Sequence, residues 1–217
     1  MLAPEPKPRS TSPPKQLRPL RRAELPAATT ELARFLLGTI LVREESRGLL
    51  AARIVETEAY LPEIDSASHA FGGPTARNRS MFLRRGHAYI YLIYGRYHCL
   101  NVTSESEDVG AAVLIRAAEP LEGVGIMRRR RGTERLADLL RGPGRLAQAF
   151  GLDRRQDGID LCSSASPLRL AAGTPPPSIG ESVRIGLNRE VDRVLRFFEC
   201  GNPFVSGPRR LNERYVS

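Results

Sequence analysis

The segment "ARIVETEAY", residues 52–60, carries two glutamates one residue apart inside an apolar run. Side chains of an extended strand alternate between two faces. One face of such a strand would carry Ile54, Glu56, Glu58 and Tyr60, and the other Val55, Thr57 and Ala59. The strand rise places the two carboxylates about 6.5 to 7 Å apart. That separation resembles the acid and base of an inverting glycosidase, where a water must fit between base and sugar.

The same two glutamates allow two other interpretations. A single desolvated glutamate could act as a general base with a raised pKa. Alternatively, both carboxylates lie on a solvated strand face without a catalytic role, which the spacing alone favours. The residues that accompany them must decide between these interpretations.

Aromatic residues near the glutamates could hold a flat ligand. Tyr60 offers a planar surface, and His69 adds a hydrogen-bond donor whose charge can switch near neutral pH. In the next apolar run, "AYIYLIY", Tyr89 and Tyr91 fall on one face of an expected strand. The stretch "AYIYLIYGRYHCLN" supplies more tyrosine than a core needs.

The alternation of that run breaks at Tyr94-Gly95-Arg96, which predicts the tip of a hairpin. An exposed tyrosine beside Arg96 suits a wedge that enters a base stack and kinks a duplex. The alternative is a tyrosine that packs against its own sheet, which is common for aromatic side chains.

The chain is strongly basic. Its 217 residues carry 33 Lys and Arg against 24 Asp and Glu, a net charge of +9 with a pI near 10.2. Such an excess attracts polyanions, so nucleic acid is the first candidate partner and an anionic membrane the second. Arginines that only solvate the surface are the alternative.

The remaining chemistry is sparse. The three cysteines, Cys99, Cys162 and Cys200, form no C-x-x-C pair and no Cys/His ligand spacing. We therefore expect neither a disulfide framework nor a zinc site, and no metal or cofactor. Free thiols, with no signal peptide and no apolar run long enough for a bilayer, lead us to expect a cytoplasmic protein.

The elements that must position these residues indicate one mixed domain. Residues 1–24, rich in proline and base, predict a disordered cationic tail before a folded domain over 25–217. A helix with Thr30 as its N-cap and Glu31 in its first turn should lead into a strand. Further strands are expected at 48–60, 88–94, 97–104, 111–120, 182–187 and 194–200.

A helical stretch is expected around residues 124–150, and a proline-rich loop at 174–177 should separate helix from late strands. The strands cluster in the middle of the chain without regular helical crossovers. This pattern predicts a mixed α+β fold in a single domain and argues against a doubly wound sheet.

From about residue 28 to 207 the chain resembles the alkyladenine (3-methyladenine) DNA glycosylase family. The segments that carry the resemblance are "RIVETEAY", "SHAFGGPTARNRSMF", "YIYLIYGRYHCLNV", "VLIRAAEPLEG", "RGPGRLAQAFG" and "RFFECGNPFVSGP", in the family's order. The resemblance implies a single domain around a curved antiparallel sheet flanked by helices. It also implies a monofunctional enzyme that removes damaged purines from duplex DNA.

The resemblance assigns roles position by position. It makes Glu58 the general base that activates water and Arg116 the residue that helps to hold this water. Tyr60, His69 and Tyr91 would be the walls that stack on or bond to the flipped base. By the same resemblance, a further residue, Asn101, would clash with the exocyclic amine of normal guanine.

The resemblance also makes Tyr94 the residue that fills the hole left in the duplex. Alkylation at N3 or N7 gives a purine a positive charge, so it stacks on tyrosine and leaves easily. One carboxylate can then both deprotonate water and stabilise the oxocarbenium-like sugar. Glu56 is accordingly expected to be structural, paired with an arginine. The only lysines, Lys7 and Lys15, lie in the tail, so no lyase step is expected.

A glycine-rich turn, Gly142-Pro143-Gly144, is expected between two helical stretches with Arg141 and Arg145 beside it. Its backbone N–H groups, Gly144 included, could hold a DNA phosphate, although the turn could equally be an ordinary helix connector. Arg96 beside the wedge is a further candidate DNA contact. The acidic segment 104–110 should point away from DNA.

We therefore expect a metal-independent, monomeric DNA glycosylase that binds duplex DNA, not a membrane, and acts on alkylated purines, with deaminated and etheno purines as further candidates. A carbohydrate-active hydrolase that uses Glu56 and Glu58 as its pair is the first alternative. A non-catalytic DNA-bending module, with Tyr94 as its wedge, is the second.

Overall fold

The computed structural model describes residues 17–213, which form one mixed α+β domain. Its α-helices are α1 (Thr29–Phe35), α2 (Val124–Arg131) and α3 (Pro143–Phe150). Its strands are β1 (Ile40–Glu45), β2 (Gly48–Tyr60), β3 (Ala88–Ile93), β4 (Tyr97–Thr103), β5 (Ala112–Glu122), β6 (Leu168–Ala171), β7 (Ile179–Val183) and β8 (Val194–Glu199). Short 3₁₀ turns lie at Arg22–Glu24, Arg79–Phe82, Leu136–Asp138, Arg154–Gln156 and Arg209–Leu211.

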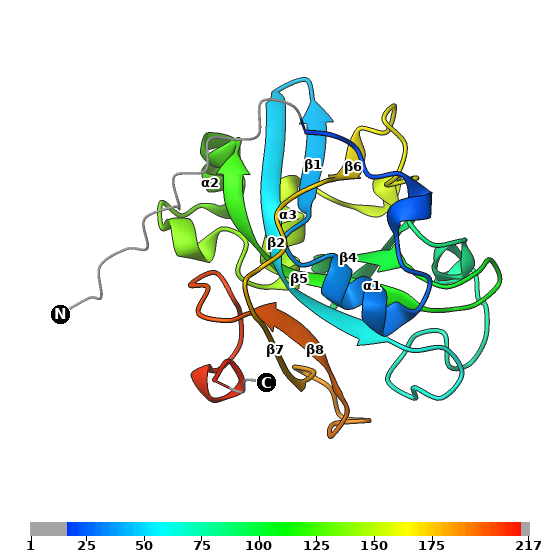
Figure 1. The fold of residues 1–217 in the computed structure, drawn as a ribbon. Coiled ribbons are helices and arrows are strands. Elements are labelled where there is room, and N and C mark those ends of the chain that lie inside the picture. Colours follow the sequence, from blue (N-terminus) through cyan, green and yellow to red (C-terminus); the bar gives the residue numbers. More distant parts are fainter. Residues whose placement is uncertain (1–16, 214–217) are drawn as a thin grey trace.

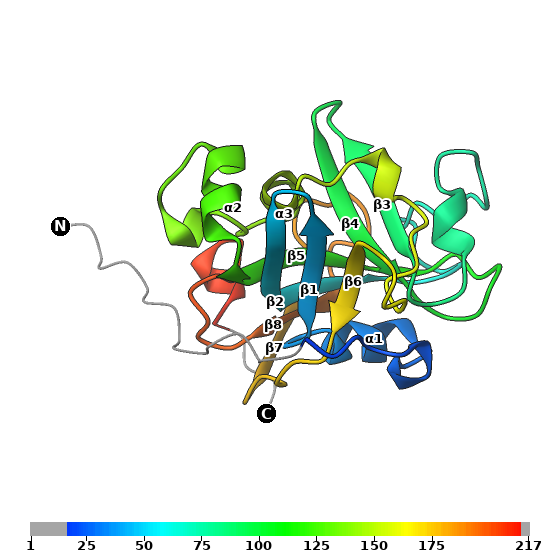
Figure 2. The same cartoon turned by 90° about the horizontal axis from the view of Figure 1, so that it is seen from above.

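All eight strands belong to one antiparallel sheet, in the order β3-β4-β5-β2-β1-β6, with β8 pairing both β2 and β7. The long strand β2 is its centre: β5 pairs with one edge of β2. On the other edge, β1 pairs with the first half of β2 and β8 with the second half. The sheet therefore curls, as Figures 1 and 2 show, which confirms the expected curved antiparallel core.

Two bulges in the β2–β5 ladder decide which side chains share a face. Ile54 pairs with Ala118, but Glu56 pairs with Ala117, so Val55 has no partner on β5. Thr57 then pairs with Ile115, which leaves Arg116 as the extra residue on β5. Such bulges re-aim side chains and are common beside active sites.

The expected alternation is therefore wrong at the start of the glutamate pair. Ile54 packs in the main core with Ala59, while Val55 lies in a separate apolar cluster beside Ala117. The bulge shifts the phase, so Glu56 and Glu58 leave the face that Ile54 occupies. The same irregularity turns Arg116 of β5 toward the two carboxylates.

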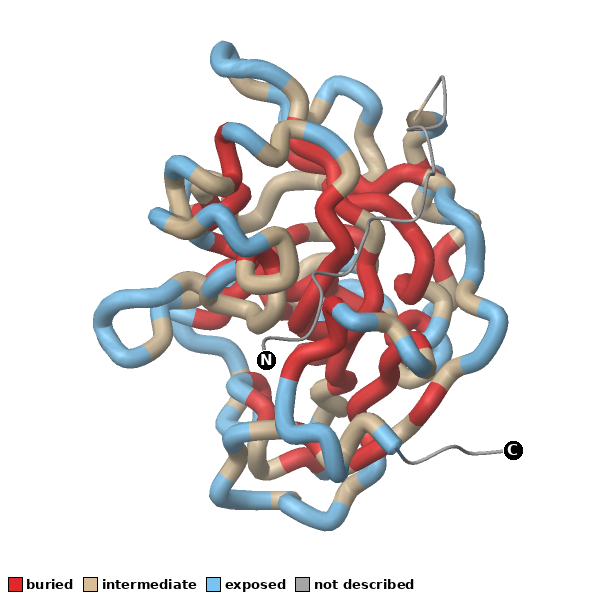
Figure 3. Tube along the Cα trace, turned by 90° about the vertical axis from the view of Figure 1, so that its left-hand side faces the viewer, coloured by how far each residue is buried: buried red, intermediate tan, exposed pale blue. Residues whose placement is uncertain are grey.

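The main apolar core lies between the curled sheet and its helices, and Figure 3 shows the buried trace running through the centre. Helix α1 packs against β2, β5 and β8, and α3 packs against β4 and β5. Thr30 is not the N-cap of α1, because the helix begins at Thr29 and Ala28 is at the cap position. Glu105 caps it from a distant loop, accepting from Thr29 N at 2.8 Å; Glu31 does lie in the first turn.

Most expected strands agree with the structure. Strand β2, for example, covers the expected residues 48–60. The late strand expected at 182–187 is displaced, because β7 ends at Val183. Strand β6 (Leu168–Ala171) was not predicted, and the proline-rich loop at 174–177 follows it rather than a helix. The helical stretch around 124–150 is divided into α2 and α3, with a 3₁₀ turn between them.

The tail is expected over residues 1–24, and its residues 1–16 lie outside the described residues. Its last part packs against the domain: Leu20 is buried, and its amide donates to Leu170 O at 3.0 Å. The expected boundary at residue 25 therefore does not coincide with the start of packed structure. Within residues 17–213, no helix is long and apolar enough to cross a membrane.

Candidate active site

Glu56 and Glu58 are both fully buried, so the interpretation of two solvated carboxylates is wrong. Arg116 lies between them. Its Nε donates to Glu56 Oε1 at 3.0 Å, and its Nη1 lies 3.2 Å from Glu58 Oε1. One guanidinium therefore compensates two buried negative charges, which would otherwise be costly to desolvate.

Glu56 is held on both oxygens. Arg196 Nε donates to Oε1 at 2.7 Å, in addition to Arg116, and Ser206 N donates to Oε2 at 2.7 Å. Burial alone would raise the pKa of this carboxyl, but the two guanidinium groups more than offset burial and hold the pKa below its usual 4.5. Glu56 is therefore an ionised anchor, and the expected pairing with an arginine is present.

Glu58 has different surroundings. Ile185 N donates to Oε1 at 2.7 Å, and the Tyr60 hydroxyl donates to Oε2 at 3.0 Å. Burial raises the pKa of Glu58 above its usual 4.5 and the charge of Glu56 adds to this, although Arg116 and the Ile185 amide oppose both. With Arg116 the carboxylate has three partners. Since it offers about four lone-pair directions, one remains for a further donor.

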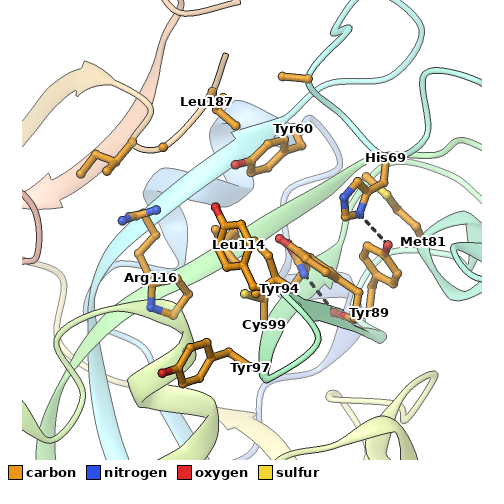
Figure 4. Close-up of a pocket in the computed structure, with 18 residues that line it drawn as sticks. Tyr60, His69, Met81, Tyr89, Tyr94, Tyr97, Cys99, Leu114, Arg116 and Leu187 are labelled. Carbon is orange, nitrogen blue, oxygen red and sulfur yellow. Dashed lines mark hydrogen bonds between the residues drawn. The ribbon is translucent and has the colours of Figure 1, made fainter. Parts of the chain in front are cut away.

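A cavity of about 410 Å³ is lined by Tyr60 and Arg116, two of the residues that contact Glu58, and Figure 4 shows the side chains around it. Tyr60 at the end of β2 stands between the cavity and the Glu58 carboxylate. The residues that line the cavity are Tyr60, Ala67, His69, Met81, Tyr89, Tyr91, Ile93, Tyr94, Tyr97, Cys99, Asn101, Leu114, Arg116, Pro143, Gly144, Ile185, Gly186 and Leu187. They come from elements far apart in the sequence, which the curled sheet and its loops bring together.

One wall of the cavity is a cluster of aromatic rings. The His69 and Tyr91 ring centroids lie 4.4 Å apart, and those of Tyr89 and Tyr91 lie 5.5 Å apart. His69 Nδ1 lies 2.8 Å from the Tyr89 hydroxyl, as the dashed line in Figure 4 marks. Burial, with Arg77, lowers the pKa of His69, and burial raises the pKa of Tyr89 to about 12. The cluster is therefore uncharged at neutral pH.

Asn101 of β4 lies beside this wall and is buried. Its Nδ2 donates to the Tyr89 carbonyl at 3.0 Å, which fixes the position of the amide group. Cys99 is also buried, and burial raises the pKa of its thiol. The three cysteines, Cys99, Cys162 and Cys200, are all free, as the sequence predicted.

The β3–β4 hairpin ends at the predicted tip. Tyr94 has φ 52° and Gly95 φ 62°, two successive positive values of the kind that a type I′ turn requires. Tyr94 is 83% exposed, so it does not pack against its own sheet. The guanidinium carbon of Arg96 lies 5.4 Å from the centre of the Tyr97 ring.

A second, open groove adjoins the cavity and is lined by Arg96, Arg131, Arg141 and Arg145. Gly144, near the start of α3, lines both cavity and groove. Arg141 is partly engaged, because its Nε donates to Val205 O at 2.8 Å. Arg145 Nη1 lies 3.2 Å from Asp138 Oδ1, yet its side chain remains 48% exposed.

The candidate residues thus fall into three groups. Those that line the cavity are Tyr60, His69, Tyr91, Tyr94, Asn101, Arg116 and Gly144. Glu58 does not line the cavity but contacts Tyr60 and Arg116, which do. Arg96, Arg141 and Arg145 line the groove instead. Sequence reasoning missed the segment Ile185–Leu187, because "SVRIGL" was expected to be strand throughout. The glycine in its middle, Gly186 with φ 80°, was the available signal of a turn. In the described part of the chain, no three His, Cys, Asp or Glu side chains gather as a metal site requires.

Comparison with known proteins matches residues 23–203 to the family model described as methylpurine-DNA glycosylase (MPG). This chain belongs to that family. A relative from Mesorhizobium japonicum is 55% identical over 196 residues, covering 90% of this chain and 93% of its own. One from Paraburkholderia phytofirmans is 51% identical over 193 residues, covering 89% of this chain and 90% of its own. Both carry the name "Putative 3-methyladenine DNA glycosylase".

Membership of the methylpurine-DNA glycosylase family confirms the resemblance that the sequence motifs indicated. It makes the chain a DNA repair hydrolase of N-glycosyl bonds, with DNA as its substrate.

Proposed function

We propose that this protein is a monofunctional DNA glycosylase that flips a damaged purine out of duplex DNA and hydrolyses its N-glycosidic bond with a water activated by Glu58. The observation that carries this proposal is the position of Glu58. It is a buried carboxylate with a raised pKa and one free lone-pair direction, in contact with Tyr60 and Arg116, which line the aromatic cavity.

Access to the lesion requires extrusion of the nucleotide, because an enzyme cannot reach a base inside a stacked duplex. Tyr94 is suited to fill the gap, since it is large, exposed and held at a hairpin tip beside the cavity. An inserted side chain of this kind partly unstacks the adjoining bases.

The extruded base then occupies the tyrosine cavity. Tyr60, Tyr91 and His69 line this cavity and are proposed to stack on the base. Asn101, which also lines it, is proposed to oppose the exocyclic amine of a normal guanine. Alkylated purines carry a positive charge that electron-rich rings attract. Deaminated and etheno purines are neutral and rely on stacking and shape.

Hydrolysis needs one general base, a side chain that accepts a proton from water. As the glycosidic bond breaks, its electron pair leaves with the purine and the sugar becomes oxocarbenium-like. Water adds to the sugar carbon and gives its proton to Glu58, whose negative charge also stabilises the cationic sugar. Arg116 is proposed to hold this water, since it lines the cavity and contacts Glu58. A cationic purine departs as a neutral base; a neutral lesion additionally needs a proton from another donor.

Glu56 is unsuited to be the second carboxylate of a carbohydrate-active pair. Both of its oxygens are occupied, and Arg116 and Arg196 hold its pKa low, so it has no proton to give. Its proposed task is to fix Arg116. The carbohydrate-active alternative therefore lacks a general acid in these residues.

The groove beside the cavity is the proposed path of the DNA backbone. Arg96, Arg141 and Arg145 line it, and Gly144 at the start of α3 separates it from the cavity. Arginine and backbone N–H groups at a helix start are both good phosphate ligands. We expect one copy of the chain to bind DNA as a monomer.

The product is expected to be an abasic site in an uncut strand. The only lysines of the chain, Lys7 and Lys15, lie outside the described residues, so no described amine can form a Schiff base with the sugar.

The test is incubation of the protein with duplexes that carry a single 7-methylguanine, hypoxanthine or ethenoadenine, in buffer containing a chelator. Free base and abasic sites are measured before any alkaline treatment. Release of base with an uncut strand is the expected result. Base release together with strand cleavage would contradict the monofunctional mechanism, and no release from any of the duplexes would contradict the activity.

A further inference from the structure

A second guanidinium lies directly behind Tyr60. The side chain of Arg184 is completely buried, and its guanidinium carbon lies 4.7 Å from the centre of the Tyr60 ring. Tyr60 lines the cavity and Arg184 does not. The ring therefore contacts a buried cation and also borders the cavity.

Arg184 has no freedom to move away from this ring. Its Nη1 and Nη2 donate to the two oxygens of Asp65 at 2.5 and 2.8 Å, and Nη1 also donates to Ala59 O at 3.0 Å. Asp65 is itself held by the amides of Leu61 and Ala67. Two bonds to one carboxylate fix the plane of the guanidinium.

The guanidinium changes what Tyr60 offers to a base. A ring face attracts a cation because the π-system is negative there. A cation held against one face uses part of this attraction, and its field repels a second cation on the other side. By contrast, no guanidinium among the described residues stacks on Tyr89 or Tyr91.

We propose that Arg184 is a specificity-determining residue that acts through Tyr60, favouring neutral damaged purines over cationic ones. The inference rests on the proposed function, in which Tyr60 is a wall of the base pocket. Bond cleavage does not add to this preference, because the charge of the departing purine becomes more negative by one unit in both cases. The preference arises when the base binds, and kcat/KM retains it.

This assignment gives a buried ion pair a task beyond folding. A purely structural Arg184–Asp65 pair would affect the folded fraction of the protein, and so the rates on all lesions alike. A charge that acts through Tyr60 changes the ratio of rates between cationic and neutral lesions instead. The ratio is independent of how much of a preparation is active.

The experiment measures kcat/KM for 7-methylguanine, a cationic purine, and for hypoxanthine, a neutral one, in otherwise identical duplexes. Arg184→Gln should raise the ratio of kcat/KM for 7-methylguanine to kcat/KM for hypoxanthine by about threefold or more, the size of a modest cation–π effect. Arg34→Gln is the matched control, since Arg34 lies 4.5 Å from the Phe197 ring, which does not line the cavity. The control ratio should equal that of the parent.

Asp65→Asn is a second variant, for which the opposite change in the kcat/KM ratio is expected. It tests the inference even if Arg184→Gln does not fold. It leaves the charge of Arg184 without its counterion, so the ratio should fall by about twofold. An unchanged ratio in these variants, or a shift in the other direction, overturns the inference while the activity stands. A parent protein that excises neither purine refutes the proposed function, and the inference falls with it.

Discussion

The phenolic oxygen of Tyr60 lies 3.0 Å from Oε2 of Glu58. The two residues are two positions apart on β2 and, beyond its bulge, share a face. The ring that begins the cavity wall therefore also donates to the carboxylate behind it. Binding of a base and activation of water are joined through one hydroxyl group.

Removal of that hydroxyl is expected to change the pH dependence of excision. In Tyr60→Phe the ring remains, but Glu58 loses a donor that stabilises its ionised form, so its pKa rises further. Because the base must be ionised, the acid limb of the pH–rate profile should move to higher pH. Single-turnover excision of hypoxanthine between about pH 5 and 9 measures this. A pH–rate profile equal to the parent's would contradict the effect of the Tyr60 hydroxyl on the pKa of Glu58.

The opposite shift is expected for Glu56→Gln. The negative charge of Glu56 raises the pKa of Glu58, and its loss also leaves Arg116 freer to stabilise the Glu58 carboxylate. The acid limb should therefore move to lower pH, with much of the activity at neutral pH retained. The same pH series provides the measurement. Complete loss of activity in a folded Glu56→Gln protein would make Glu56 a catalytic group rather than an anchor.

The buried network around Glu56 is expected to stabilise the fold. Arg196 is fully buried and also donates to Ser182 Oγ at 2.8 Å and Ser206 O at 3.0 Å. Arg196→Met leaves Glu56 with half of its compensation and should lower the free energy of unfolding by about 3–5 kcal/mol. Urea denaturation at pH 7 measures the change. Arg209→Met, at a side chain that is 93% exposed, should leave the urea midpoint unchanged.

The pH dependence of this stabilisation follows from the pKa of Glu56. Because its folded pKa lies below the ordinary 4.5, its ionic contribution is fully present above about pH 4.5 and is lost as pH falls through the folded value. Loss of Arg196 raises the pKa of Glu56 in the variant, so the difference in stability between Arg196→Met and the parent should begin to shrink at that raised pKa and vanish only below the pKa of the parent. A difference that disappears by pH 6 would contradict the charged state of Glu56.

The exposed hairpin tip is expected to matter for duplexes more than for single strands. Tyr94→Ala removes a side chain that is 83% exposed, so the fold should be unaffected. Loss of the wedge should slow excision from a duplex by about tenfold, since unstacking a base costs a few kcal/mol. A lesion in single-stranded DNA should show a smaller change, and Tyr94→Phe should resemble the parent. Equal slowing on both substrates would contradict the wedge.

Local patterns in the sequence were sufficient for much of the site. Alternation and apolar content located β2 over residues 48–60, and the break at Tyr94-Gly95-Arg96 located the hairpin tip. Both signals depend on neighbouring residues only. The tyrosines at 89 and 91 face one way because β3 is regular, and the cavity therefore contains the residues that alternation predicted.

The rest depends on contacts between distant residues. The bulges at Val55 and Arg116 arise from the pairing of β2 with β5, which no single strand reveals. For the same reason the cap of α1 comes from Glu105, 76 positions away from Thr29. Arg184 and Arg196 gave no sequence signal, since an arginine at an edge and a buried one look alike. Only the folded chain shows their carboxylate partners.

Glu58 is the proposed general base, and the most direct test of this role separates binding from excision. Glu58→Gln keeps the shape of the side chain but cannot accept a proton from water. It should bind a duplex containing hypoxanthine within about threefold of the parent affinity, while single-turnover excision falls by about 10²–10⁴-fold. Glu134→Gln, at a side chain that is 87% exposed, should match the parent in both measurements. Excision by Glu58→Gln at the parent rate would contradict the mechanism proposed here.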